Sequence, residues 1–356
     1  MDFGFYLPCY WPDMSYPPDR LYADMLEQAK LVEDLGFVSV TIPEHHFINY
    51  LVHPSTLLTA VKIASVTKRM KVMTAILVLP FSDMRRLAGE IAQTDCLTDG
   101  RLELGVGRGA FQYEFDRFGI PPAESRERFV DALQLLIKLL TETDVSWKSK
   151  WYDFPPLTTM PRVVQKPHPP IWIAALAPEA IYSSVKFGHH VMTTPLRDPF
   201  NAAKAQAEAF FRAQREEGEK AKHLLFSTLR MTYIGTSESD IREKRRMAMD
   251  NHRRFSNVFE TPGEVIGGAI KPLDRVTISE EEVEKALIIG SADYVLEKMM
   301  AYGDLGVHNM QLNGTFGASH RDAMRSLELF AEKVMPHFTG TPGSVSWSNQ
   351  APVAAK

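Results

Sequence analysis

The segment Lys71–Val106, KVMTAILVLPFSDMRRLAGEIAQTDCLTDGRLELGV, contains one complete strand–helix–strand unit. Its first part, Lys71–Leu79, is a nearly continuous apolar run, which is typical of a strand buried on both faces of a parallel sheet. Asp83–Leu97 has the pattern of an amphipathic helix closed by Asp99-Gly100, and Arg101–Val106 has the pattern of the next strand. The segment therefore predicts two parallel strands joined by a helical crossover.

The same alternation continues on both sides of this segment and gives eight strand–helix units over residues 1–338. Eight near-equal units without a composition break favour one (β/α)8 TIM barrel over an open, doubly wound sheet. Two long irregular stretches, Trp147–Pro170 and Ser256–Ile289, predict insertions at the barrel rim after strands four and seven. The remaining residues 339–356 are rich in Gly, Pro, Ser and Ala, which predicts a disordered tail.

The charge and composition of the chain limit the kinds of partner that we expect. The 356 residues carry a net charge of −4, and no basic block suits nucleic acid or an acidic membrane. The densest basic stretch, Arg242–Arg254, includes acidic residues and indicates a solvated helix face. No apolar run approaches the ~20 residues that span a bilayer, and the first residues lack the pattern of a signal peptide. With only two cysteines, the expectation is a cytoplasmic protein with reduced thiols.

The most informative polar cluster is Pro43-Glu44-His45-His46-Phe47, directly after the second strand. In a barrel this position lies at the rim that carries active sites. Three consecutive ionisable side chains cannot all point the same way, so at most two share a pocket. Imidazole titrates near neutral pH, which favours acid–base chemistry over a structural pair of histidines that holds a loop. A metal site needs about three convergent ligands, and no other strand end supplies them.

Two further segments at strand ends are candidates for binding an anion. Gly105–Ala110 places glycines at alternate positions around Arg108, which suits a phosphate but equally suits a tight turn. Ala174–Glu179 places small residues before Pro178 at a predicted helix start, where free amides can hold a phosphate. Close packing of strand and helix explains the same small residues, so both interpretations of this segment stay open.

Together these segments resemble the bacterial luciferase-like flavin monooxygenase family from Met1 to about Phe338. The resemblance rests on five segments in order, each at the matching strand: Glu44 to Phe47; Thr74-Ala75 with Val78 to Pro80; Gly105 to Gly109 with Glu114-Phe115 and Phe118-Gly119; Ser291-Ala292 to Gly306; and Arg325 to Phe330 with Met335-Pro336.

The resemblance implies FMN bound at the carboxyl rim. It implies that Gly107 and Arg108 meet the phosphate, with help from the backbone near Ala175 and Ala177. The family has a serine near Ala177, so here the missing contact is expected from Glu179 or from backbone amides. Glu44 and Ala75 are expected beside the flavin ring, and His45 is expected to be the catalytic imidazole.

The activity implied is oxygenation of a small organic substrate by O2 and reduced FMN, through a flavin hydroperoxide kept dry under a lid. The lid is expected in Ser256–Ile289, with Gly263, Gly267 and Gly268 as flexible points. Aromatic residues between Trp147 and Phe154 predict a wall of a pocket for an apolar or aromatic substrate, or a small core under a loop.

The resemblance also implies partners. No nicotinamide-binding fingerprint is present, so a separate reductase is expected to supply the reduced flavin. The family forms dimers through its second and third helices, and the apolar helix Thr56–Thr67 is compatible with a homodimer. A deazaflavin-dependent hydride transfer on the same barrel, or a flavin-binding barrel without catalysis, remains an alternative.

Overall fold

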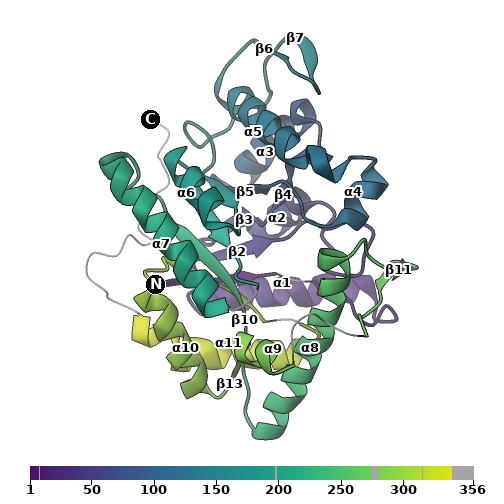
Figure 1. Cartoon of the computed structure of the whole chain (residues 1–356), viewed down its shortest axis with the longest axis vertical. Helices are drawn as coiled ribbons and strands as arrows, with labels where there is room; N and C mark the ends of the chain where they lie inside the picture. The colour runs from purple at the N-terminus through teal and green to yellow at the C-terminus, as the bar shows by residue number, and fades with distance from the viewer. Residues whose placement is uncertain (8, 197–198, 275–279, 315, 339–356) are drawn as a thin grey trace.

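The structure is a computed structural model that describes residues 1–7, 9–196, 199–274, 280–314 and 316–338. The tail 339–356, for which the sequence predicts disorder, lies outside the described residues. Most of the described chain wraps around a single closed sheet at the centre of the molecule (Figure 1).

Eight parallel strands of the described chain close into the predicted barrel, because the first strand pairs with both the second and the last. The ladder between first and last strands runs from Asp2 opposite Asn309 to Phe5 opposite Leu312. In barrel order the strands are β1 (Asp2–Tyr6), β2 (Ser39–Ile42), β3 (Lys71–Thr74), β5 (Leu102–Gly107), β8 (Ile171–Ala174), β9 (His190–Thr193), β10 (Phe226–Ile234) and β14 (Asn309–Asn313).

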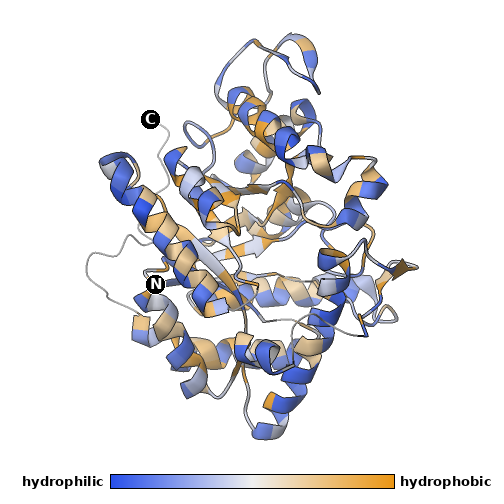
Figure 2. Cartoon of the chain, viewed as in Figure 1, coloured by the Kyte–Doolittle hydropathy of each residue, from blue (hydrophilic) through white to orange (hydrophobic). Residues whose placement is uncertain are grey.

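Helices cover the outside of the barrel and bury its apolar strands (Figure 2). Each helix presents an apolar stripe to the sheet at helical spacing, as Leu135, Leu136, Leu139 and Leu140 do in the longest helix of the fourth unit. The covering helices are α1 (Pro18–Asp34), α2 (Thr56–Ala64), α3 (Met84–Leu97), α5 (Ser125–Thr141), α6 (Pro178–Lys186), α7 (Pro199–Glu217), α10 (Ala292–Asp304) and α11 (His320–Lys333).

Two predicted segments differ in detail from the structure. The run Lys71–Leu79 is not one strand: β3 ends at Thr74, a cis peptide joins Ala75 to Ile76, and β4 (Leu77–Val78) leads into the short helix η1 (Leu79–Phe81). The stretch after strand four is also not wholly irregular. It begins with an antiparallel hairpin of β6 (Val145–Lys148) and β7 (Asp153–Leu157). Buried apolar side chains of this hairpin pack against the main core.

The stretch after strand seven is more ordered than the sequence predicts. Helix α8 (Glu238–Glu260) continues well past Ser256, and a hairpin of β11 (Val265–Ile266) and β12 (Ala269–Ile270) follows it. Gly267 and Gly268 form the two-residue turn with positive φ at both positions, the geometry that glycine adopts without strain. Helix α9 (Glu280–Ala286) and strand β13 (Ile288–Gly290), which pairs with β10, complete this insertion.

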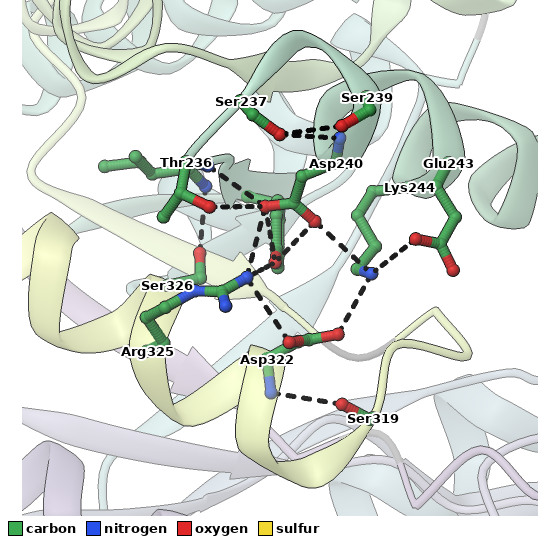
Figure 3. Close-up of polar contacts among 12 residues, drawn as sticks. Thr236, Ser237, Ser239, Asp240, Glu243, Lys244, Ser319, Asp322, Arg325 and Ser326 are labelled. Carbon is green, nitrogen blue, oxygen red and sulfur yellow. Dashed lines mark hydrogen bonds and ion pairs between the residues drawn. The ribbon is translucent and has the colours of Figure 1, made fainter.

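A buried network of charges fixes the start of α8 to α11 (Figure 3). The Lys244 side chain is 3% exposed and its Nζ lies 3.0 Å from Asp322 Oδ2 and 3.4 Å from Asp240 Oδ1. The Arg325 guanidinium donates to Asp240 at 3.1 Å. Lys244 and Arg325 each pair with both Asp240 and Asp322, so this network holds the two helices in one relative position.

The close approach of β3 to β5 depends on Gly105. A Cβ atom at this position would lie 1.9 Å from the backbone oxygen of Thr74 and 2.8 Å from Met192 Cε. The Thr74 hydroxyl also donates to the Gly105 carbonyl at 2.8 Å. A larger residue would therefore push two hydrogen-bonded barrel strands apart.

We expect Gly105→Ala to lower the free energy of unfolding by about 2–3 kcal/mol, because the added methyl group meets backbone that cannot move away. Urea denaturation measures the change. Gly89→Ala in α3 is the matched control: its Cβ would have 3.6 Å to the nearest atom, and we expect a gain of about 0.5–1 kcal/mol in a helix interior. Equal effects of the two substitutions would contradict the close approach described here.

Candidate functional site

The loop after β2 directs its three ionisable side chains to two sides, as the sequence requires. The Glu44 carboxylate accepts the backbone N–H of Val78 at 3.1 Å and lies 2.9 Å from His46 Nε2. His45 turns the other way and stacks on the ring of Phe111, with 4.5 Å between centroids and 12° between planes. Glu44 and His46 therefore form one pair, and His45 occupies a separate environment.

Glu114, in the short helix α4 (Gln112–Phe118), joins both parts of this loop. Its Oε1 accepts the backbone N–H of His46 at 2.7 Å and lies 3.2 Å from His45 Nδ1. The Glu114 side chain is 2% exposed, so these two contacts are shielded from water. A carboxylate oxygen accepts hydrogen bonds, so it favours the His45 tautomer with the proton on Nδ1 and leaves Nε2 as the acceptor.

His45 lies at the edge of a buried apolar group that we name the mouth cluster. Its members come from segments that follow the carboxyl ends of β1, β2, β5 and β10, so the cluster lies across the mouth of the barrel. Its buried residues are Tyr6, Tyr10, Ile48, Tyr50, Leu51, Phe111, Tyr113, Val258 and Ile270, with Ala75 among the partly buried side chains packed against them.

Burial dominates the electrostatics of the mouth cluster. It raises the pKa of Tyr10 to about 12 and raises the pKa values of Tyr6 and Tyr50 as well, so these hydroxyls stay protonated at neutral pH. Burial also lowers the pKa of nearby His53 to about 4, which keeps that imidazole neutral.

Arg108 and the start of α6 follow two neighbouring strands, β5 and β8. Arg108 follows β5 and is exposed, and we find no ion pair or hydrogen bond to its guanidinium among the described residues. On the adjacent strand β8, Ala175 is buried and the exposed Ala177 precedes α6, without a side chain that caps the helix. An arginine and a helix start without a side-chain cap thus follow neighbouring strands, and both are groups that can bind an anion.

Backbone contacts connect the loop after β2 with Arg108. Val78, whose N–H donates to Glu44, pairs in register with Gly107. A Cβ on Gly107 would lie 2.2 Å from Ile76 Cδ1, so a larger residue would require the end of the Ile76 side chain to move. Glu44, Ala75, Gly107 and Ala175 thus follow one arc of the rim along neighbouring strands, as the sequence predicts.

Glu179 lies at the rim, whereas the aromatic residues between Trp147 and Phe154 pack against helices, as in the second of their two interpretations. Glu179 lies in the first turn of α6 with an exposed carboxylate, which repels a phosphate, so only its backbone N–H can serve as a donor. The aromatic residues between Trp147 and Phe154 pack beside α5 and the start of α3, where the Trp147 indole donates to Asp131 at 3.0 Å. They lie outside the mouth cluster, which supplies the aromatic surface near His45 instead.

Sequence reasoning did not assign Glu114 or Phe111 to the site. Both lie in or beside a helix of seven residues, too short to show helical periodicity. The only signal was the position of Glu114 in a segment that resembles the family. No group of three or more His, Cys, Asp or Glu side chains in the described part of the chain is placed to hold a metal ion.

None of the described helices combines the length and the apolar character that a membrane crossing needs.

Comparison with known proteins agrees with the fold. A sequence model of the family described as "Luciferase-like monooxygenase" matches residues 1–309. The oxygenase component of the flavin-dependent trigonelline monooxygenase of Acinetobacter baylyi is 29% identical over 328 residues, which cover 90% of this chain and 91% of that protein.

Solved structures of other proteins share the barrel fold of this chain. The monooxygenase RslO1 from Streptomyces bottropensis has a TM-score of 0.83 and 25% identity, covering 95% of this chain and all of that chain. An F420-dependent secondary alcohol dehydrogenase has a TM-score of 0.74 with 16% identity, over 94% of this chain and 98% of that one, and shares the fold. The family match covers most of the chain, and the chain therefore belongs to the luciferase-like family of flavin-dependent monooxygenases.

Proposed function

We propose that this chain is the oxygenase component of a two-component monooxygenase, which binds reduced FMN at the barrel rim and oxygenates a small apolar or aromatic substrate. The observation that carries the proposal is the arc from His45 and Glu44 to Arg108, with the mouth cluster beside it. It provides an imidazole, an anion site and an apolar surface at one end of the barrel.

The rim residues fit FMN by charge and by shape. A phosphate carries negative charge, and Arg108 is an exposed cation next to the uncapped start of α6. Gly107, Ala174, Ala175 and Ala177 are small, which would leave room for backbone amides to approach the phosphate. Ala75, packed at the edge of the mouth cluster, would leave space for the flavin ring beside Glu44.

When bound, reduced FMN would supply two electrons to O2, so that one oxygen atom enters the substrate and the other leaves as water. The chain would contribute proton handling and exclusion of water. Glu114 holds His45 at Nδ1, so Nε2 is the atom that would accept or return a proton. The mouth cluster would keep water from the reacting atoms and would offer Tyr and Phe rings to an aromatic substrate.

The trigonelline enzyme is named as an oxygenase component, which supports a separate reductase as the source of reduced FMN for this chain. A homodimer through α2 and α3 is part of the proposal. Leu58 on α2 is 72% exposed, and the two helices lie side by side. A monomer in analytical ultracentrifugation would contradict the dimer without affecting the proposed chemistry.

The function is tested by mixing anaerobic protein and reduced FMN with oxygenated buffer and following flavin absorbance. We expect reoxidation at a rate clearly different from that of free reduced FMN, because the bound flavin is shielded from water. A rate equal to that of free FMN, together with binding of a reduced deazaflavin coenzyme and no O2 uptake, would replace this function with hydride transfer. Binding of FMN without any reaction would indicate a non-catalytic barrel.

Arg108→Ala should weaken FMN binding about 10- to 100-fold, the loss expected for one charge-assisted contact to a phosphate. Riboflavin, which has no phosphate, should bind equally to the variant and to the unmodified protein. Fluorescence titration measures both affinities. Arg215→Ala, at an exposed arginine in α7, is the matched control and should change neither. A variant that still prefers FMN over riboflavin as strongly as before would remove Arg108 from the phosphate site.

His45→Ala should retain the fold and FMN binding but lower product formation about 10²- to 10⁴-fold, as expected for a lost acid–base group. Product is measured with a substrate selected by its effect on O2 uptake. His337→Ala, at an exposed histidine in the short helix η4 (Met335–Phe338), is the control and should leave turnover unchanged. Turnover that survives His45→Ala would exclude the imidazole from the reaction.

A further inference from the structure

The end of α8 and the β11–β12 hairpin, both in the insertion after strand seven, cover the mouth cluster, and we name them its roof. Val258 near the end of α8 and Ile270 in β12 are buried members of the cluster, and Phe255, Phe259 and Val265 pack against it. The floor is formed by residues of the loops after β1, β2 and β5. Phe255 lies 6.0 Å from both the Tyr50 and the Phe111 rings, between centroids, so the roof reaches the ring that stacks on His45.

Asn49 connects this roof to the floor. Its backbone N–H donates to the Gly268 carbonyl at 2.7 Å, and its side-chain Oδ1 accepts the Ile270 N–H at 3.0 Å. On its other side, Asn49 Nδ2 donates to the Trp11 carbonyl at 3.0 Å, and the Trp11 N–H donates to the Asn49 carbonyl at 3.1 Å. One residue, 3% exposed, thus joins the loops after β1 and β2 to the hairpin of the insertion.

The two ends of α8 are held by different kinds of contact. At its start, Lys244 and Asp240 belong to the buried charged network with α11 (Figure 3). Toward its other end, Arg254 of α8 donates to the Ile270 carbonyl at 2.5 Å and so holds the hairpin to the helix itself. In the described chain, the hydrogen bonds that we find from the β11–β12 hairpin to the barrel rim both go to Asn49. The start of α8 is therefore held by charges, whereas the hydrogen bonds of the hairpin to the rim depend on Asn49.

We propose that Asn49 is a positioning residue that couples closure of the β11–β12 hairpin over the mouth cluster to the placement of His45. Asn49 lies four residues after His45 in the same loop, so releasing the hairpin also frees this loop from its contact with the roof. The Asn49 side-chain amide can join the two segments because its Oδ1 accepts from the hairpin and its Nδ2 donates to the loop after β1. It carries no charge and holds the roof equally at all pH values near neutral.

The role of Asn49 in catalysis rests on the proposed function, because a roof matters only if water must be excluded. The hydrogen bonds of Asn49 are present in the structure whether or not the proposed function is correct. An Ile270 N–H without its acceptor would be buried and unsatisfied when the roof is closed, which favours the open state. Opening would admit water to the mouth cluster and would release the reduced oxygen as hydrogen peroxide rather than as product.

The experiment uses full-length protein with Asn49→Ala, Asn49→Asp or Lys271→Ala. The Asp variant keeps an oxygen that can accept from Ile270, whereas the Lys271 variant removes only an exposed ion pair with Glu264 in the same insertion. Hydrogen–deuterium exchange of flavin-free protein is measured over residues 262–271 and over the barrel strands. With reduced FMN and O2, the hydrogen peroxide released per O2 consumed is measured in parallel.

We expect Asn49→Ala to speed exchange over residues 262–271 about 10-fold or more and to raise peroxide release several-fold, with barrel strands unchanged. Asn49→Asp should show a smaller increase in exchange, and Lys271→Ala none. Unchanged exchange over 262–271 in Asn49→Ala, or equal acceleration throughout the barrel, would overturn the proposal. Faster local exchange without any reaction with FMN would contradict the proposed function and leave the connection through Asn49 established.

Discussion

Pairing of the first strand with the last is the interaction on which the rest of this structure depends. The ladder from Asp2–Asn309 to Phe5–Leu312 turns an open sheet into a ring, and every strand then ends at the same rim. Without it, the loops after β1 and β10 would lie at opposite edges of a sheet. Because they lie side by side, the roof from the seventh unit can cover the loops of the first and second units.

At that rim, buried polar contacts set the positions that apolar packing cannot specify. Glu114 fixes the loop after β2 through the His46 N–H and His45 Nδ1, and Glu44 fixes the approach of β4 through the Val78 N–H. Each carboxylate is almost fully buried, so its charge is tolerated only where donors surround it. The consequence is a loop held at two points, in which the His45 imidazole stacks on Phe111 of the mouth cluster.

Much of the fold follows from sequence because each strand–helix unit carries its own periodic pattern. Lys71–Val106 alone predicts two barrel strands and their crossover, and the arc from Glu44 to Ala177 could be placed on successive strand ends. The strand-seven insertion was predicted as irregular because its order comes from contacts distant in sequence. Ile270 and Asn49 are 221 positions apart, and β13 is held by pairing with β10 rather than by a pattern of its own.

The same reason explains the unpredicted members of the site. Glu114 and His45 are separated by 69 residues, and no spacing rule connects them. The break between β3 and β4 was hidden because Ala75 and Ile76 are apolar, like the strand residues around them. Local patterns therefore placed the elements, whereas the partners of individual polar side chains required the folded chain.

The buried Lys244 network has a consequence for engineering within this family. Exchanging the strand-seven insertion for that of a relative, in order to change what the barrel accepts, would separate Lys244 and Asp240 from Asp322 and Arg325. Asp322 and Arg325 would still pair with each other at 3.3 Å, but α11 would lose the contact with buried Lys244 that positions α8. A chimera that transfers the insertion together with α11 keeps this contact.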